Sequence, residues 1–294
     1  MIEKAPPPQR VSIDTILPST MAQRAEAGGV TRAAMGPLSV FVLSVLAGAF
    51  ISFGAVFATT IGAGNVGVDA VIPYGVMRLL TGIVFCTGLI LVVVGGAELF
   101  TGNNMLVMAW AGGKVTTRAM LANWTVVFIG NFLGAIATAA LVFASTQYTF
   151  GGGAVGLNAL VIANGKSALG FVPAFMLGVL CNALVCLAVW MCYGARTTID
   201  RVVTIIPPIS AFVAAGFEHS IANIYFIPMG LFIKAGAPDS FWNGIGKSPT
   251  DFPAVTWYNF FANLIPVTAG NIVGGSVMVA AVYWFVYLRK KPTG

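Results

Sequence analysis

The sequence predicts an all-α protein that crosses a membrane six times, as two repeated sets of three helices. Three observations lead to this fold class. First, 58% of the 294 residues are hydrophobic and only 8% are charged, whereas a soluble domain has about a quarter charged residues on average. Second, the apolar residues form long uninterrupted stretches, as membrane-spanning helices of about 20 residues require. Third, two short residue patterns of the first half recur in the second half.

Six apolar stretches are long enough to span a bilayer. They cover residues 37–61, 74–97, 119–145, 169–193, 202–234 (with an interruption) and 261–288. We therefore expect a cytoplasmic N-terminal segment at 1–36, a transmembrane domain at 37–288 and a cytoplasmic tail at 289–294. Within the N-terminal segment, three prolines at 6–8 predict a flexible start. Residues 12–26 are expected to form an amphipathic helix on the membrane surface, with a disordered tail as the alternative.

The positive charges predict the orientation of these helices. Eleven of the 15 Lys and Arg residues lie in four regions that six spans place on one side: the N-terminus (Lys4, Arg10, Arg24, Arg32), loop 112–118 (Lys114, Arg118), loop 194–201 (Arg196, Arg201) and the tail (Arg289, Lys290, Lys291). The positive-inside rule then puts both termini in the cytoplasm. This distribution accounts for the net charge of +6 without a nucleic-acid partner.

The recurring patterns indicate an inverted repeat. The pattern G-x-E-x-x-x-x-N begins at Gly96 and again at Gly216, 120 residues later. The pattern G-N-x-x-G begins at Gly130 in the third span and at Gly270 in the sixth. An odd number of spans separates the copies, so the second set is upside down relative to the first. Proteins with such repeats form their transport site where broken helices meet near the midplane.

Each G-x-E pattern lies where a helix is expected to break. At the end of the second span, glycines 95, 96 and 102 have no side chain and so allow the helix to break. The asparagines at 103 and 104 can cap the helix that follows. In the fifth span, prolines 207 and 208 and Gly216 are expected to interrupt the helix. Because non-helical backbone at membrane depth must be buried or line a watery cavity, two such breaks predict one central pore.

Two glutamates lie at membrane depth, one at each break. Ionisable groups inside a membrane cost about 2.5–3.5 kcal/mol on insertion scales and are functional by default. Glu98 and Glu218 are equivalent in the repeat, as are Asn103 and Asn223. This symmetry favours a shared role as loop scaffold, in which each glutamate accepts hydrogen bonds from nearby backbone N–H groups.

His219 is the one histidine in the sequence and has no counterpart in the repeat, where Leu99 takes its place. Imidazole changes protonation near neutral pH, so His219 is the candidate for donating a hydrogen bond or a proton to a passing anion. The alternative is a packing histidine. Thr101 aligns with Ile221 and supplies a hydroxyl at the other break, as a predicted partner of His219 or of the substrate.

Further residues are candidates for the entrance and walls of the pore. Lys166 is the lone cation of the outward loop 146–168 and is predicted to steer anions, with an ordinary solvated lysine as the alternative. Five apolar residues are candidates for constrictions, although they can equally face lipid or the core: Phe85, Leu89, Leu99, Phe100 and Phe212.

Other functional classes leave no trace in the sequence. All four cysteines lie in apolar stretches without a C-x-x-C pair, which argues against a metal site or disulfide framework. No G-x-S-x-G, metal-binding histidine pair or P-loop occurs, so we expect neither an enzyme nor a cofactor. A water channel would carry paired Asn-Pro-Ala motifs, which are absent, and an inert membrane scaffold would gain nothing from two broken helices.

Longer motifs resemble the formate–nitrite transporter family over most of the chain, from about residue 17 to 289. They are Leu17-Pro18, GAELFT at 96–101, NALVCLAVW at 182–190, GFEHSIAN at 216–223, IPMG at 227–230 and NLIPVT at 263–268 followed by Gly270-Asn271. The resemblance implies an aquaporin-like protomer of six helices in a bacterial cytoplasmic (inner) membrane. It further implies a homopentamer with one pore in each protomer.

The resemblance also implies roles for individual residues. His219 resembles the central pore histidine, Thr101 the threonine of the first break, Asn182 a hydrogen-bonding pore residue, and Lys166 a vestibule lysine. The five apolar candidates resemble two constrictions. Phe217 and the motif at 227–230 favour formate channels. The chain departs from that pattern at Gly102-Asn103, where nitrite-type members also carry a glycine.

The implied function is passage of formate and related small monovalent anions, with nitrite, lactate, acetate or hydrosulfide as alternatives. A bare carboxylate in a narrow apolar pore faces a steep desolvation cost. Desolvation also makes the carboxylate more basic. We therefore expect formate to take up a proton, with His219, Thr101 and Asn182 nearby, and to cross as the neutral acid.

Overall fold

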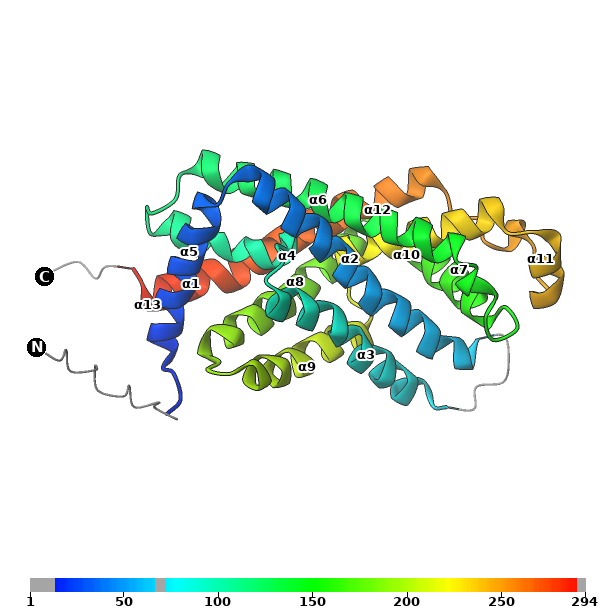
Figure 1. Ribbon diagram of the computed structural model, residues 1–294, viewed down its shortest axis with the longest axis horizontal. Coiled ribbons are helices and arrows are strands. Elements are labelled where there is room, and N and C mark those ends of the chain that lie inside the picture. Colours follow the sequence, from blue (N-terminus) through cyan, green and yellow to red (C-terminus); the bar gives the residue numbers. More distant parts are fainter. Residues whose placement is uncertain (1–13, 67–71, 290–294) are drawn as a thin grey trace, which may run out of the picture.

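A computed structural model describes residues 14–66 and 72–289, which form a bundle of helices with no strand in these two ranges (Figure 1). Within these two ranges, six helices are long and apolar enough to cross a membrane, as predicted. The flexible start expected at 6–8 and the tail beyond 289 lie outside the described residues.

The helices follow one another in the order of the two repeats. The first repeat comprises α2 (Pro37–Gly62), α3 (Tyr74–Gly95), α4 (Phe100–Asn103), η2 (Asn104–Leu106), α5 (Val107–Ala111) and α6 (Thr117–Ala144). The second comprises α8 (Phe171–Gly194), α9 (Thr198–Ala215), α10 (Ser220–Gly236), α12 (Trp257–Ile272), the π-helical η5 (Val273–Ala281) and α13 (Val282–Tyr287). Outside the repeats lie α1 (Pro18–Ala34), α7 (Ala154–Ser167), α11 (Asp239–Ile245), η1 (Ala63–Asn65), η3 (Gln147–Thr149) and η4 (Pro249–Asp251).

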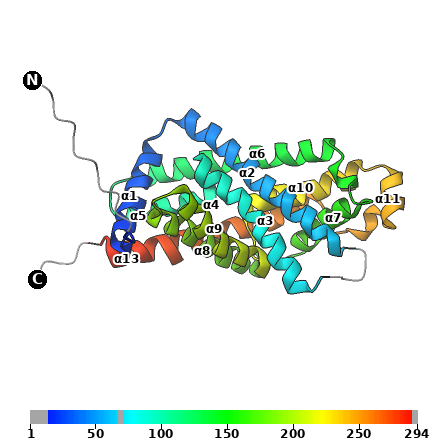
Figure 2. The same cartoon turned by 60° about the horizontal axis from the view of Figure 1, so that its bottom comes forward.

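The molecule has two ends, which Figures 1 and 2 show at opposite sides of its long axis. We call the end with α1 and α13 the inner end, and the end with α7 and α11 the outer end. The connections α5–α6 and α8–α9, which carry the predicted positive loops, both lie at the inner end (Figure 1). At the outer end α11 turns away from α10 by 111°. The cationic loops therefore share one side of the bundle.

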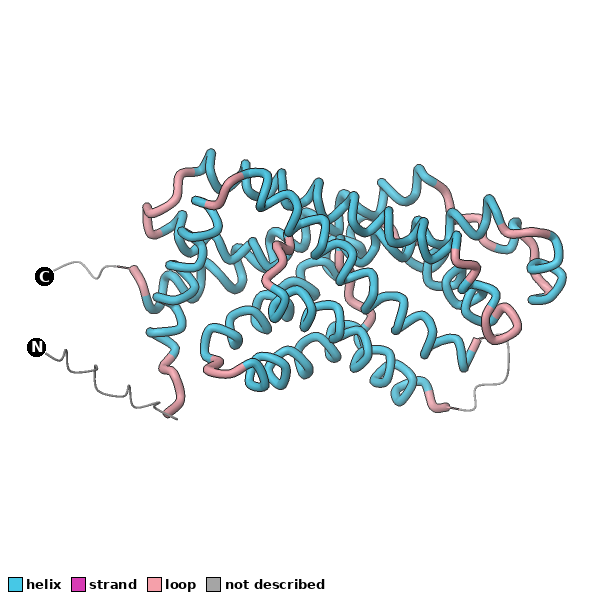
Figure 3. The backbone as a smooth tube through the Cα atoms, in the orientation of Figure 1, coloured by secondary structure: helices cyan, strands magenta, loops and turns pink. Residues whose placement is uncertain are grey.

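Two helices are broken near the middle of the molecule. The first break, residues 96–99, separates α3 from α4, and the second break, residues 216–219, separates α9 from α10. Figure 3 shows both as loop segments inside the bundle. The second predicted span, 74–97, is confirmed by α3, which ends at Gly95. Beyond the first break the chain runs on through α4, η2 and α5 to Ala111 at the inner end.

One glycine causes each break. Gly96 has φ = +74° and Gly216 has φ = +78°, a left-handed conformation that ends a helix and that glycine adopts at little cost. The other predicted helix breakers behave differently. Gly102 lies inside α4, and Pro207 and Pro208 lie inside α9. Proline has a backbone φ that fits a helix, so the cost there is a missing hydrogen bond rather than an end of the helix.

The expected surface helix is present but shifted. It runs over Pro18–Ala34 instead of 12–26, because Pro18 occupies the first helical turn, where its fixed φ and missing N–H cost nothing. It also does more than lie on a surface, since Ala22, Ala25 and Gly29 are buried against α5, η2 and α8. A Cβ on Gly29 would lie 3.0 Å from the Cβ of Ala109 in α5. The helix thus closes the inner end of the bundle.

The G-N-x-x-G patterns explain how the third span of each repeat packs against the first. In α6, Gly134 lies against the backbone of Val45 in α2, and in η5, which continues α12, Gly274 lies against the backbone of Val179 in α8. A side chain at either glycine would collide with backbone, so small residues let these helices approach closely, as in many membrane bundles. Both repeats use the same contact, which confirms the inverted repeat.

Candidate functional site

Each break is held by the same set of side-chain hydrogen bonds. Glu98 Oε2 accepts a bond of 2.7 Å from Asn103 Nδ2, and Glu218 Oε2 accepts one of 2.6 Å from Asn223 Nδ2. The same amides also donate, Asn103 to Asn123 at 3.0 Å and Asn223 to Asn263 at 2.8 Å. The glutamates lie at the breaks as predicted. The expectation that backbone N–H groups donate to the glutamates was wrong. In each break the donor is the side-chain amide of the asparagine five residues later.

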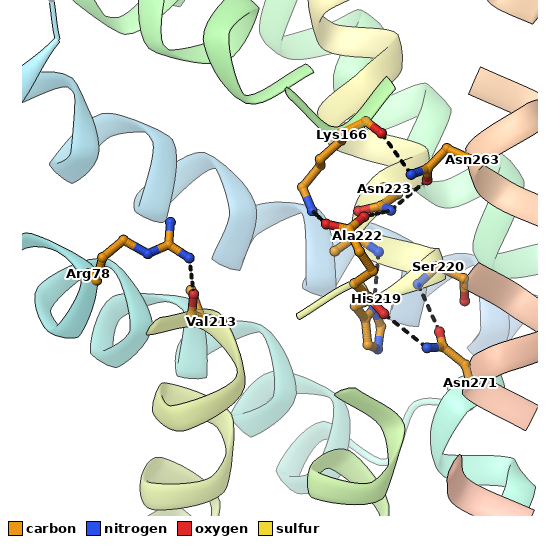
Figure 4. A network of polar contacts seen from close by, with 10 residues as sticks. Arg78, Lys166, Val213, His219, Ser220, Ala222, Asn223, Asn263 and Asn271 are labelled. Atoms are coloured by element: carbon orange, nitrogen blue, oxygen red, sulfur yellow. Dashed lines mark hydrogen bonds and ion pairs between the residues drawn. The ribbon is translucent and has the colours of Figure 1, made fainter. Parts of the chain in front are cut away.

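A second pair of asparagines ties each break to a neighbouring span. Asn131 donates to the carbonyl oxygens of Ser44 and Glu98, at 2.7 and 2.9 Å, and accepts from the Phe100 N–H at 2.8 Å. Asn271 does the same with Gly178, Glu218 and Ser220, at 2.8, 3.0 and 2.9 Å. Figure 4 shows Asn271 reaching Ser220. Sequence reasoning did not assign these two residues a role, although the repeated G-N-x-x-G pattern contains them.

Each glutamate also pairs with a cation from a helix outside the repeats. Glu218 lies 2.8 Å from Nζ of Lys166 in α7, and Glu98 lies 3.3 Å from Nε of Arg32 in α1. The Lys166 side chain is 18% exposed and its Nζ lies 5.4 Å from the centre of the Phe226 ring. Lys166 is therefore not the freely solvated lysine of the alternative reading. Arg32 had been recognised only as one of the cytoplasmic charges.

The predicted hydrogen bond between the two breaks is present. His219 Nε2 lies 3.0 Å from Thr101 Oγ1, and His219 Nδ1 accepts a bond of 3.1 Å from the backbone N–H of Ala222. Because Nδ1 is already an acceptor, the proton of the neutral ring lies on Nε2 and is donated to Thr101. Both side chains are almost fully buried. The arrangement gives the middle of the molecule one N–H donor and one hydroxyl.

Two cavities approach this pair from opposite ends. The outer cavity includes His219, Lys166 and Arg78 in its lining, and the inner cavity includes Leu99, Arg32 and Glu98. They share no lining residue.

Apolar side chains line part of each cavity. In the outer cavity the rings of Phe85 and Phe212 meet edge to face, with centroids 5.7 Å apart. In the inner cavity, Leu89 and Leu99 are both buried to within 3% exposure. Four of the five residues predicted to form constrictions therefore line a cavity, two in each.

The comparisons with known proteins agree with this geometry. The family model described as "Formate/nitrite transporter" matches residues 19–285. The chain belongs to this family. It is 44% identical to "Formate channel FocA" of Escherichia coli strain K12 over 278 residues, 94% of this chain and 96% of the relative. It is also 39% identical to "Formate channel FocA" of Haemophilus influenzae, over 92% of this chain and 94% of the relative.

Solved structures of the family share the fold. One is described as "Pentameric formate channel with formate bound" and is similar with a TM-score of 0.81 at 44% identity, covering 86% of this chain and 98% of that chain. A second, described as "FNT family ion channel", has a TM-score of 0.74 at 29% identity, covering 90% and 98%. The six-span broken-helix protomer is thus the architecture of this formate/nitrite transporter family member.

Two residues expected in the pore of this family member point elsewhere. Asn182 is fully buried and lines neither cavity, and its amide donates to Asn104 at 2.9 Å and to the carbonyl of Asn271 at 2.6 Å. Phe100 also lines neither cavity and packs edge to face on Trp124 and Phe128. Phe100 follows the first break in α4 and Asn182 lies in α8, and both side chains pack between helices.

Proposed function

We propose that the protein conducts formate across the membrane through a path in each protomer, from the outer cavity past His219 and Thr101 to the inner cavity. The observation that carries this proposal is the buried His219–Thr101 hydrogen bond between two cavities that are partly lined by apolar side chains. The names of the relatives in Escherichia coli and Haemophilus influenzae, and the pentameric relative with bound formate, support formate as the substrate.

The apolar side chains along this path require the substrate to lose its charge. Formate entering a region without water faces a large desolvation cost, which raises its affinity for a proton. It then crosses as formic acid and ionises again in the opposite cavity. Lys166 and Arg78 both line the outer cavity. The charge of Lys166 is paired with Glu218, whereas Arg78 binds carbonyl oxygens and keeps a net positive charge that attracts anions.

The hydrogen bonds of His219 favour one of its two predicted roles. Its Nδ1 accepts from Ala222, so the neutral ring carries its single proton on Nε2. Giving that proton away would leave an imidazolate, which is too basic to form at neutral pH. His219 therefore acts as a hydrogen-bond donor, and its Nε2–H exchanges the acceptor Thr101 for the substrate. The proton that neutralises formate comes from water in the cavity.

The assembly and orientation follow the same reasoning. We place the protein in a bacterial inner membrane as a homopentamer, each chain with its own path, because a similar solved structure is described as pentameric. The positive loops at the inner end support a cytoplasmic location for that end, and with it for both termini.

The test compares two replacements of the histidine. In proteoliposomes, His219→Asn keeps an N–H donor without a titratable group, whereas His219→Phe keeps a ring without a donor. We expect uptake of radiolabelled formate to survive in the asparagine variant and to fall more than tenfold in the phenylalanine variant. Uptake in the unaltered protein should rise as the pH falls from 8 to 5, following the concentration of formic acid. Uptake that is constant over this range would refute proton-assisted passage.

Nitrite remains the second candidate, favoured by the Gly102-Asn103 pair after Thr101. The same liposomes decide between the two anions. If unlabelled nitrite competes with formate more strongly than unlabelled formate does, nitrite is the preferred substrate.

A further inference from the structure

The chain around Thr101 has little helical structure of its own to hold it in place. Thr101 lies in α4, which has four residues and passes directly into the three-residue η2. Such a short helix is not stable by itself, because few hydrogen bonds offset the ordering of its backbone. The Thr101 hydroxyl nevertheless lies 3.0 Å from His219 Nε2. The position of Thr101 therefore depends on contacts with other helices.

Two side chains of α8 reach the carbonyl oxygen of Thr101. Asn182 Nδ2 and Cys186 Sγ each lie 3.3 Å from this oxygen. An amide has two protons, and Asn182 makes shorter bonds to Asn104 Oδ1 at 2.9 Å and to the Asn271 carbonyl at 2.6 Å. The other acceptor near the Cys186 thiol, Asn182 Oδ1, is 3.9 Å away. The single S–H of Cys186 is therefore the donor left for the Thr101 carbonyl.

A glycine behind these side chains gives them the space they occupy. A Cβ on Gly275 would lie 2.5 Å from Asn182 Nδ2 and 2.7 Å from Cys186 Sγ. It would also lie 2.9 Å from the Cβ of Asn104. These distances are too short for a real Cβ, so any other residue at this position would displace the donors of Thr101. Gly275 belongs to the π-helical η5, a conformation that is frequent at functional sites.

The other break has no such support. The glycine contacts of the third spans align the two repeats and pair Cys186 with Ser52 of α2. The Ser52 hydroxyl donates to the carbonyl of Gly48 in its own helix, at 2.8 Å. The counterpart of Thr101 is Ile221, and no side chain in residues 14–66 or 72–289 donates to its carbonyl. The contact of Cys186 is therefore not part of the framework that the repeats share.

From these contacts we infer that Cys186 and Gly275 are positioning residues for Thr101. The Cys186 thiol holds the Thr101 carbonyl, and Gly275 leaves the space that the thiol needs, so that the Thr101 hydroxyl stays opposite His219. Both residues are buried and line neither cavity. They act through Thr101 and do not touch the substrate.

The consequence for transport rests on the proposed function. There, the substrate replaces Thr101 as the acceptor of the His219 N–H. A threonine that is fixed through its carbonyl stays in place during this exchange and accepts the N–H again when the substrate leaves. Without the thiol, Thr101 is free to shift, and the N–H loses its defined direction toward the path.

The sequence offers a direct readout of this arrangement, because His219 is its one histidine. Protein made with isotope-labelled histidine, and purified without a histidine tag, gives nuclear magnetic resonance signals of this ring alone. In lipid bilayers we would record the Nε2–H signal, whose shift follows the strength of its hydrogen bond. Thr101→Val, which removes the acceptor, supplies the reference for the broken bond.

We expect Cys186→Ala and Gly275→Ala to move the His219 signal toward that of Thr101→Val. Cys186→Ser keeps a donor and should leave the signal near that of the unaltered protein. The double variant Cys186→Ala with Thr101→Val should match Thr101→Val alone, because Cys186 acts through Thr101. Cys186→Ala removes a single atom and so provides the test even if Gly275→Ala does not fold.

Cys181→Ala is the matched control. Cys181 is also a fully buried cysteine of α8, but it does not contact Thr101. It should leave the His219 signal unchanged. The inference is overturned if Cys186→Ala leaves the signal unchanged, or if Cys181→Ala moves it as far. It is also overturned if Thr101→Val does not move the signal.

Uptake into proteoliposomes tests the role in transport. The initial rate of formate uptake per folded protein should fall about threefold in Cys186→Ala, as expected for the loss of one ordinary hydrogen bond, and recover in Cys186→Ser. Unchanged uptake in Cys186→Ala would refute the role in transport. If the signals respond as expected but no variant takes up formate, the positioning of Thr101 stands and the proposed function fails. If formate is taken up while the signal ignores Cys186→Ala, the channel stands and the inference fails.

Discussion

The two breaks share a scaffold but differ at the centre. In both, a left-handed glycine ends one helix, a glutamate accepts from the asparagine five residues later, and an asparagine of a neighbouring span holds the following backbone. Only the second break has a histidine, and only the first has a threonine at the facing position. The repeat therefore supplies the framework twice, and chemistry arises where the two copies have diverged.

The largest expected effect comes from removing a scaffold asparagine. Asn131→Leu or Asn271→Leu leaves two carbonyls and one N–H of a break without a partner inside the bundle, and each unsatisfied buried group costs about 1–3 kcal/mol. We expect both variants to lose most of their folded protein, measured as monodisperse protein after detergent extraction and as the midpoint of thermal unfolding. Equal losses would support equivalence of the breaks as framework.

A matched control is Asn158→Leu. Asn158 is also buried, but its amide donates to a single carbonyl, that of Thr59, at the outer end of α2. This variant should lose much less than either scaffold variant. If only one of the two scaffold asparagines behaves differently from this control, the breaks are not equivalent in stability.

The cations that pair with the glutamates should give a smaller and unequal effect. Lys166→Gln and Arg32→Gln each leave a buried carboxylate without its counter-ion, which costs about 3–5 kcal/mol for a fully buried pair and less here, since both cations are partly exposed. Lys166 is nearer to its glutamate, at 2.8 Å against 3.3 Å, and less exposed, at 18% against 29%. We therefore expect the larger drop in thermal unfolding midpoint for Lys166→Gln.

Double variants show whether the ion pair itself is responsible. Adding Glu218→Gln to Lys166→Gln removes the uncompensated charge and should recover part of the lost stability, and Glu98→Gln should do the same for Arg32→Gln. If neither double variant is more stable than its single variant, the cations act through packing and not through charge.

Several of these features could be predicted from the sequence because they are local and repeated. The hydrophobic stretches predicted the spans, and the recurring pattern G-x-E-x-x-x-x-N predicted the breaks. His219 and Thr101 were identified as candidate site residues because the equivalent positions of the other repeat hold different residues. Other features depend on how distant helices meet. Nothing around Arg32 in the sequence indicates that α1 brings it to Glu98, and nothing around Asn182 indicates that α12 accepts its amide. Side-chain direction after a break was equally inaccessible, as Phe100 illustrates.

The smallest effect concerns a loop at the outer end, which serves as a reference for the pH dependence of the breaks. The pKa of Asp251 in η4 is lowered, because the backbone N–H and hydroxyl of Ser248 donate to its carboxylate. A depressed pKa in the folded state stabilises the fold above the ordinary pKa of about 3.9. That contribution is lost only as the pH falls below this value toward the lowered pKa.

Between pH 5 and 8, Asp251→Asn should therefore leave the shape of the pH profile of formate uptake unchanged. Its effect on stability should be a small constant offset over the same range, measured by thermal unfolding at each pH. A pH profile that changes with Asp251→Asn would place part of the pH response in this loop. If the pH profile is unchanged, the pH response comes from protonation of the substrate at the two breaks.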